Sequence, residues 1–388
     1  MREAASFEQL LAAKEIVICC GAGGVGKTTV AAAAAAMASV SLGGTVLVLT
    51  IDPARRLADA LGLEALGNNE TQVPPDVLRR AGIEPRGQLW AAMLDTKQSW
   101  DDLVRAHAPD ARTAERILEN PLYQNVSGRF VQSHEYIAME RLYEIHNSGK
   151  YDLIVVDTPP TRNALDFLEA PDRMADFFSS RLLRWLTLPS RSRVMNLASR
   201  PFAQVADRLL GSQFLEDITE FFLLFQTMYD GFVERSRAVK RLIHDRRTTF
   251  VVVTTLEAAP LREAEYFMEA LAGQNLHPGA LVLNKVLPSY LLDPEAARTA
   301  ERLRADAPAL VAGLAGVLPE GVDDPAQVAR VLAEVGDSYL NFAVVAKREA
   351  EQRAELARVP DVVVSVPYFD TDIYDLTGLL RLGRAIWG

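Results

Sequence analysis

Cysteine is scarce in this sequence. The 388 residues include only two cysteines, Cys19 and Cys20, and these are adjacent. Neighbouring residues of a strand point to opposite faces, so this pair cannot readily form a disulfide or chelate a metal together. The scarcity excludes a disulfide framework and fits a reducing compartment.

The sequence also has fewer basic than acidic residues, and it lacks long apolar runs. The chain has 41 Lys and Arg against 51 Asp and Glu, a formal net charge of −10, which argues against a nucleic-acid binder held by phosphate contacts. No uninterrupted apolar run approaches the roughly 20 residues that span a bilayer. Residues 1–14 lack the apolar centre of a signal peptide. We therefore expect no nucleic-acid partner, and a cytoplasmic protein, either free or peripheral to the membrane.

Apolar residues, by contrast, make up 49% of the chain, enough for a large core. Short runs rich in Val, Ile and Leu alternate with helical stretches, a pattern typical of a parallel sheet with helices on both faces. We predict an α/β fold with a doubly wound, mainly parallel sheet of about seven to eight strands. The predicted strands are Ile16–Cys20, Thr45–Ile51, Leu89–Leu94, Leu153–Val156, Phe250–Thr254, Leu281–Leu283 and Val362–Val366.

The strands are unevenly spaced along the chain, and long helical stretches separate some of them. The sequence contains no internal repeat and one phosphate-loop motif. We therefore predict a single domain over residues 1–388, with helical insertions at about 97–148, 162–247 and 290–358.

The phosphate-loop motif is Gly21-Ala22-Gly23-Gly24-Val25-Gly26-Lys27-Thr28-Thr29, which fits G-x-x-x-x-G-K-[ST] between a strand and a helix. Glycines let the backbone wrap around phosphate, and the helix N-terminus adds partial positive charge. Lys27 is predicted to bridge the β- and γ-phosphates, and the Thr28 hydroxyl to bind Mg²⁺. A glycine-rich turn without a ligand is the alternative, which the complete motif in its proper context disfavours. The predicted nucleotide contacts are Gly21, Gly23, Gly24, Val25, Gly26, Lys27, Thr28 and Thr29.

Two carboxylates follow predicted strands. Asp157 ends the strand Leu153–Val156, where P-loop enzymes hold Mg²⁺, usually through a water, although an Asp there can also cap the next segment. Asp52 follows the second strand, and ligands in open α/β sheets bind at the carboxyl ends of strands. We predict that Asp52 is catalytic and orients the attacking water. An N-cap role before Pro53 is the alternative, and the two roles are compatible.

Together these segments resemble the ArsA-type, anion-transporting ATPases, which include the eukaryotic targeting factors for tail-anchored membrane proteins and belong with the deviant Walker A ATPases. The resemblance runs over most of the chain, through Gly21–Thr29, Thr50–Ala54, Asp157–Thr161, Leu283–Lys285 and Val366–Asp370. It implies an ATPase that needs Mg²⁺ and works as a dimer, with the two subunits facing each other across their nucleotides. ATP-driven closure would then form a client surface from the helical insertions.

The resemblance also implies contacts to the base. Asn284 would hydrogen-bond the adenine, and Pro367 and Phe369 would close over it. By itself, an Asn that ends a strand is ordinarily a turn residue.

The second helical insertion is a candidate client surface. Its apolar residues recur at three- and four-residue steps, which gives a broad apolar helix face. Arginines gather around Trp185, and such a stretch can lie on anionic membrane or grip an acidic partner. A helical subdomain with its own core and a solvated arginine face is the alternative. The residues are Ile218, Phe221, Phe222, Phe225, Met228, Tyr229 and Phe232 on the apolar face, and Arg181, Arg184, Arg191, Arg193, Arg200 and Arg208 around Trp185.

Ala22 departs from the family pattern. Members of the deviant class usually carry a lysine there, which reaches the partner's phosphates, and a comparable trans-acting arginine is worth on the order of 10³–10⁵ in rate. Three explanations are open: a slow ATPase, a paralogue that supplies the lysine, or substitution by Arg55, Arg56 or Arg162. We favour a heterodimer over a homodimer. A weakly hydrolysing regulatory subunit is therefore the alternative to the ATP-gated switch.

The metal expectations follow from the same scarcity of cysteine. No C-x-x-C is present, so we expect neither a zinc clamp nor an arsenite site, and a reductase would need cysteines at an iron–sulfur cluster. The five histidines lack ligand spacing. ATP and Mg²⁺ are the only ligands expected. A metabolite kinase also uses a P-loop, but the paired switch segments and helical insertions favour dimer gating.

Overall fold

The computed structural model describes residues 6–51, 56–126, 133–159, 220–224, 226–276, 278–313, 324–356 and 362–387, and the single residues 169, 170, 172, 173, 176, 217 and 360. Within these residues the chain forms one eight-stranded sheet in the order β3-β4-β2-β5-β1-β6-β7-β8. Every pairing is parallel except that of β3 with β4. The strands are β1 Ile16–Cys20, β2 Thr45–Thr50, β3 Thr71–Gln72, β4 Gln88–Met93, β5 Leu153–Asp157, β6 Thr248–Thr254, β7 Pro278–Val286 and β8 Val362–Pro367.

This sheet confirms the predicted α/β class and its mainly parallel character. Strand β3 was not predicted, because two polar residues carry no apolar pattern. The central strands are apolar along their whole length because both of their faces are covered. In β1, Ile16, Ile18 and Cys20 join one apolar cluster, while Val17 and Cys19 join the other.

One face of the sheet is covered by short helices and by α2. Six consecutive alanines in α2 lack bulk, so the helix can lie close to its neighbours. A Cβ on Gly383 of α19 would lie 2.2 Å from Cγ of Met37, which shows how closely α19 and α2 pack. The helices that contribute to this face are α1 Phe7–Ala12, α2 Lys27–Ser41, α3 Arg56–Leu61, α4 Pro75–Arg80 and α19 Leu376–Trp387.

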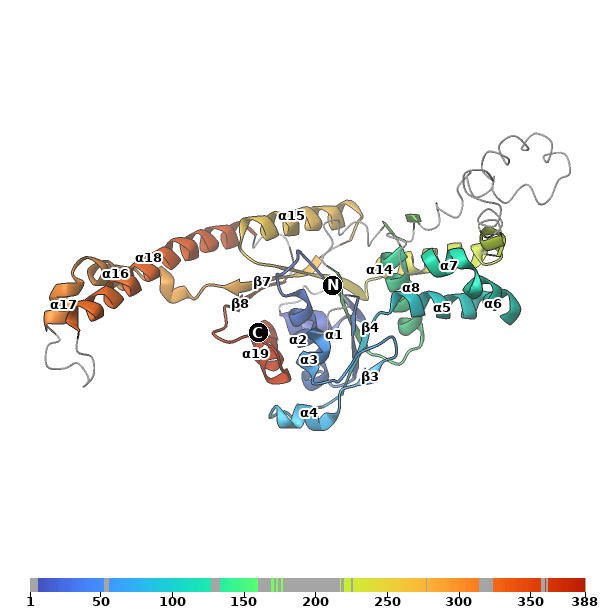
Figure 1. Cartoon of the computed structure of the whole chain (residues 1–388), viewed down its shortest axis with the longest axis horizontal. Helices are drawn as coiled ribbons and strands as arrows, with labels where there is room; N and C mark the ends of the chain where they lie inside the picture. The colour runs from blue at the N-terminus through green and yellow to red at the C-terminus, as the bar shows by residue number, and fades with distance from the viewer. Residues whose placement is uncertain are drawn as a thin grey trace, which may run out of the picture.

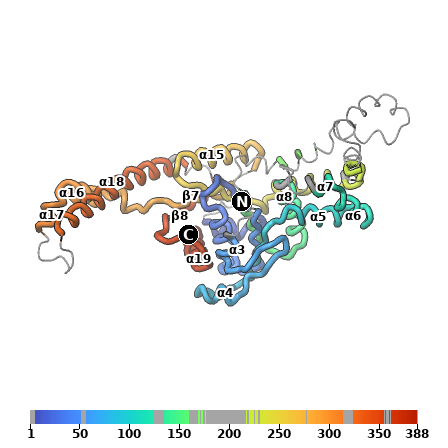
Figure 2. The backbone as a smooth tube through the Cα atoms, in the orientation of Figure 1, coloured from blue at the N-terminus to red at the C-terminus, as the bar shows by residue number. Residues whose placement is uncertain are grey.

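The opposite face carries longer helices, and two groups of helices extend beyond the sheet. Figures 1 and 2 show α16, α17 and α18 as an arm on one side of the molecule, and α5 to α8 on the other. The division into one domain with insertions remains a prediction. The helices are α5 Thr96–His107, α6 Ala111–Glu119, α7 Pro121–Val126, α8 Ser133–Asn147, α14 Tyr229–Ile243, α15 Ala258–Gly273, η2 Ser289–Leu292, α16 Pro294–Ala305, α17 Ala307–Gly313 and α18 Pro325–Leu356.

The apolar face predicted in the second insertion is partly described by the structure. Phe221, Met228 and Phe232 are buried and join the core beneath α5 and α8. The ring of Phe232 lies 6.2 Å from that of Trp100 and 6.1 Å from that of Tyr136, between centroids. These three residues are therefore core rather than exposed surface, as in the second interpretation, but their cluster also includes residues of the sheet, so it is not a separate subdomain core. Ile218, Phe225, the side chain of Tyr229, Trp185 and the six arginines around it lie outside the described residues.

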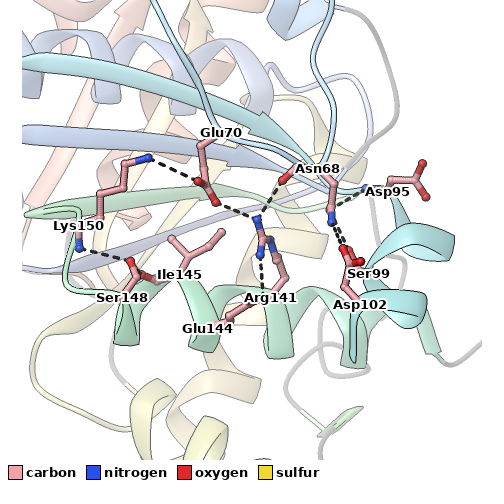
Figure 3. Close-up of polar contacts among 10 residues, drawn as sticks. All are labelled: Asn68, Glu70, Asp95, Ser99, Asp102, Arg141, Glu144, Ile145, Ser148 and Lys150. Carbon is pink, nitrogen blue, oxygen red and sulfur yellow. Dashed lines mark hydrogen bonds and ion pairs between the residues drawn. The ribbon is translucent and has the colours of Figure 1, made fainter. Parts of the chain in front are cut away.

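A polar cluster joins α8 to the segment that leads into β3 (Figure 3). The guanidinium of Arg141 donates to the backbone oxygen of Asn68 at 3.0 Å and to the carboxylate of Glu70 at 2.8 Å. The side-chain oxygen of Asn68 accepts from the Ser99 hydroxyl at 2.8 Å, which brings in α5. Because these hydrogen bonds connect α5 and α8 to the segment before β3, we interpret the cluster as a structural link at the edge of the sheet.

Candidate functional site

The phosphate loop connects β1 to α2 at the carboxyl edge of the sheet. Gly21, Gly24 and Gly26 have φ angles of 147°, 79° and 95°, in a region that residues other than glycine rarely adopt. A Cβ on Gly21 would lie 2.0 Å from the carbonyl oxygen of Val253, so β6 leaves no room for a side chain there. The backbone conformation thus favours glycine at all three positions, and close contacts exclude a side chain at Gly21, against β6, and at Gly26, against Asn284.

Lys27 is the first residue of α2, and its side chain lies within the loop. Its ammonium donates to the carbonyl oxygen of Ala22 at 2.7 Å, and the residue is only 6% exposed. The next residue, Thr28, is half-buried in the first turn of the same helix. The helix N-terminus and the lysine thus place positive charge at one end of the loop.

Asp157 stands at the end of β5, the strand that pairs with β1. It lies opposite Cys19 in the register and is fully buried. Its Oδ2 accepts a hydrogen bond from the Thr50 hydroxyl at 2.9 Å, and the Thr158 hydroxyl donates to the carbonyl of Cys19 at 2.8 Å. A residue of β2 therefore fixes the carboxylate, and the residue after Asp157 is bonded to β1 beside the phosphate loop.

Burial and nearby charges shift the pKa values of the two cysteines. Burial raises the pKa of the Cys19 thiol; the charge of Asp157 raises it further, and the charge of Lys27 partly offsets this. Burial likewise raises the pKa of Cys20. Both thiols are therefore protonated at neutral pH and act as small core residues.

The oxygen atoms of Thr28 and Asp157 fit Mg²⁺, which prefers hard oxygen ligands and takes only one or two from protein in nucleotide sites. In the described ranges, no group of three or more His, Cys, Asp or Glu side chains is placed to hold a metal. A site with one hydroxyl and one carboxylate suits a metal that arrives with its nucleotide.

Asn284, near the end of β7, lies against the phosphate loop. Its Nδ2 donates to the carbonyl oxygen of Val25 at 2.7 Å, and its Oδ1 accepts from the backbone N–H of Lys285 at 3.0 Å. Sequence reasoning missed this support of the loop, because 259 residues separate the two partners. The proposed adenine contact of Asn284 stays a prediction.

The other two predicted base contacts lie at and just after the end of β8, which pairs with β7. Pro367 lies opposite Val286 in the register and is exposed. Phe369 is half-buried, and the guanidinium carbon of Arg381 lies 4.7 Å from its ring centroid. The fold thus brings Asn284, Pro367 and Phe369 to neighbouring strand ends, and their contact with a base remains a prediction.

Asp52, the predicted catalytic residue, lies outside the described residues. So do Arg55, Arg162 and the side chain of Arg56, the three candidates for a substitute cation. The flanking positions are described: Ile51 donates its N–H to the backbone oxygen of Asp157 at 3.0 Å. The segment that carries Asp52 therefore begins beside Asp157.

A glycine loop between a buried strand and a helix, a lysine at the helix start and an Asp at the end of the adjacent strand define a P-loop nucleotide-binding protein. The sequence model of one such family, described as Anion-transporting ATPase, matches residues 14–306. The chain belongs to this ArsA ATPase family, which confirms the resemblance read from the motifs and implies nucleotide binding.

Curated relatives agree. The chain is similar to ATPase BagA of Mycobacterium tuberculosis, with 30% identity over 39% of this chain and 42% of that protein. It is also similar to ATPase ASNA1 homolog 1 of Paramecium tetraurelia, with 28% identity over 63% of this chain and 67% of that protein. The chain thus spans less than half the length of the mycobacterial relative. Among the helices that the structure describes, none is long and apolar enough to cross a membrane.

Proposed function

We propose that this chain binds and hydrolyses Mg²⁺-ATP, and that the nucleotide switches a dimer that handles a protein or membrane-associated client in the cytoplasm. The observation that carries the proposal is the pairing of a buried lysine within the phosphate loop with a fully buried Asp on the adjacent strand. A buried lysine and a buried carboxylate are costly to keep in a fold without use for their charges.

Each residue then has a defined role. Lys27 exchanges its bond to the Ala22 carbonyl for the β- and γ-phosphate oxygens, while the backbone N–H groups of the loop surround the phosphates. Thr28 and Asp157 would hold Mg²⁺, Asp157 through a water, and the metal would supply positive charge at the phosphates. Asp52 orients the attacking water.

The contact between β2 and β5 can couple the two segments that follow these strands, as a nucleotide switch requires. The Thr50 hydroxyl and the Ile51 N–H both bond to Asp157, so the segments after β2 and after β5 begin at one place. A change at the phosphates can therefore act on both segments together. The helical insertion predicted at about 162–247 follows β5 in the chain, which supports transmission to the client surface.

Ala22 supports a second candidate function, a weakly hydrolysing subunit that pairs with a paralogue. This alanine is 7% exposed and packs in the apolar cluster that contains α2. A lysine supplied by a partner subunit would complete the charge at this site. The main proposal permits either a homodimer or a heterodimer, and the rate of turnover by the isolated chain distinguishes them.

The test measures ATP hydrolysis by the purified chain with Mg²⁺ over a range of protein concentrations, beside ATP binding. Lys27→Ala and Asp52→Asn should abolish turnover, while Lys347→Ala, an exposed lysine of α18, should leave it unchanged. Specific activity that rises with concentration supports a self-sufficient dimer.

If the wild type binds ATP tightly with negligible turnover, and Ala22→Lys restores turnover, the result supports a subunit that needs a lysine from its partner. Because Ala22 is nearly buried, the thermal stability of Ala22→Lys is measured in parallel. A chain that binds no ATP would overturn both functions.

A further inference from the structure

Helix α18 is the longest helix of the described chain, with 32 residues, and it lies beyond the region that matches the family model. One side of it packs on the neighbouring helices of the arm. Ala329 joins Ala307 and Val311 of α17 in a small apolar cluster. A Cβ on Gly336 would lie 2.5 Å from the carbonyl oxygen of Ala300, so α16 and α18 approach closely there.

A different side of α18 is apolar and exposed. Four large apolar residues are each about half exposed: Val331 (51%), Val335 (53%), Phe342 (52%) and Val345 (48%). With Ser338 they follow one another at steps of four, three, four and three residues. These five residues are called the α18 seam. This alternation of steps places side chains in one stripe and is the pattern by which helices pair in coiled coils.

We propose that the α18 seam binds the same seam of a second copy of this chain, in antiparallel orientation. The proposal rests on charges that flank the seam. Glu334 and Arg348 are exposed, lie on the same edge of the stripe, and form no ion pair within the described part of the chain. In an antiparallel pair each Glu334 faces the other copy's Arg348, so two ion pairs form.

The same register fits the side-chain sizes within the seam. It places Val335 against Val345, and Phe342 against the small Ser338, on both sides of the two-fold axis. A parallel pair would instead set like residues level with each other and leave Glu334 and Arg348 without opposite charges. This self-complementarity is what singles out a second copy rather than an unrelated helix as the occupant.

The seam is short, so the pairing should be weak. From Val331 to Val345 the helix rises about 21 Å at 1.5 Å per residue. The contact area falls at or below the low end of stable protein interfaces, and the association should therefore depend on concentration. The pairing uses no residue of the phosphate loop, so it stands or falls independently of the proposed ATPase activity.

Charge reversal tests the orientation. Sedimentation velocity of the full chain without nucleotide measures the dissociation constant of the wild type, Glu334→Arg, Arg348→Glu, the double variant and an equal mixture of the two single variants. Each single variant creates two repulsions and should raise the dissociation constant on the order of tenfold. The double variant should behave as wild type, and the mixture should associate more tightly than either single variant alone.

Two further variants separate the seam from the rest of the surface. Phe342→Glu should abolish association, while Lys347→Glu, an exposed charge reversal away from the seam, should leave it unchanged. Circular dichroism verifies that both variants remain folded. A wild type that is monomeric at all concentrations, or a dimer that none of the seam variants weakens, would overturn the proposal.

A crosslinking experiment gives a positive readout. Asn341 is exposed on the same edge of the stripe as Glu334. In the antiparallel register the two copies of Asn341 face each other at the two-fold axis, whereas the two copies of Glu334 lie about 21 Å apart. A short bismaleimide should therefore crosslink Asn341→Cys and not Glu334→Cys. Cys19 and Cys20 are buried and should not react. Equal crosslinking of both variants would refute the antiparallel arrangement.

Discussion

Replacing Gly26 by alanine probes the contact between the phosphate loop and β7. Gly26 has φ of 95°, and an added Cβ would lie 2.4 Å from Nδ2 of Asn284. The left-handed backbone conformation alone costs alanine about 1–2 kcal/mol. Displacing the Asn284 amide breaks its bond to the buried carbonyl of Val25, a further loss of about 1–3 kcal/mol.

Gly24→Ala is the matched control, because Gly24 has a similar φ of 79° but nothing within 4 Å of its added Cβ. It should cost only the backbone term. Asn284→Ala removes the same hydrogen bond without the strain. In the double variant Gly26→Ala, Asn284→Ala the hydrogen bond is lost only once, so the total cost should be about that of Gly26→Ala alone rather than the sum of the two single costs.

Thermal and urea unfolding measure the stability of the four variants, and titration with a fluorescent ATP analogue measures binding. We expect Gly26→Ala to be the less stable of the two glycine replacements and to bind nucleotide more weakly. Equal destabilisation by Gly24→Ala and Gly26→Ala, or strict additivity in the double variant, would refute the claim that Asn284 supports the loop.

Two ion pairs yield further predictions. Glu140→Ala leaves the guanidinium of Arg235 buried without the partner that lies 2.6 Å away, and should cost about 3–5 kcal/mol in thermal unfolding. Glu84→Ala, which breaks an exposed pair, should cost less than about 1 kcal/mol; similar losses in both variants would contradict the burial argument. Hydrogen bonds from Arg247 lower the pKa of Asp245 to about 2, so its contribution to stability is present above pH 3.8 and lost as the pH falls through 2. An NMR titration should show this value, and Arg247→Ala should return it toward 3.8; an unchanged pKa in that variant would contradict the assigned cause.

Contiguous residues were sufficient to predict the fold class and the centre of the site. The strand, loop and helix from Ile16 to Ser41 are local in sequence, and the motif itself identified the loop's glycines and lysine, although the contacts of Gly21 with Val253 and of Gly26 with Asn284 could not be predicted from it. The strand that ends in Asp157 could also be predicted from its apolar run, because a strand buried on both faces is apolar throughout. Strand β3 was not predicted, because it has only two residues and is stabilised by its pairing with β4 rather than by a pattern of its own.

Only the tertiary structure decided which distant residues meet. The hydrogen bond from Asn284 to Val25 depends on β7 lying near the phosphate loop, and no local pattern encodes that distance. Likewise, helical periodicity identified the apolar face of the second insertion but not what covers it. Phe221, Met228 and Phe232 are buried under α5 and α8, whereas the apolar seam of α18 is exposed. Periodicity determines that a helix has an apolar face, and the packing of the remaining chain determines whether that face is core or surface.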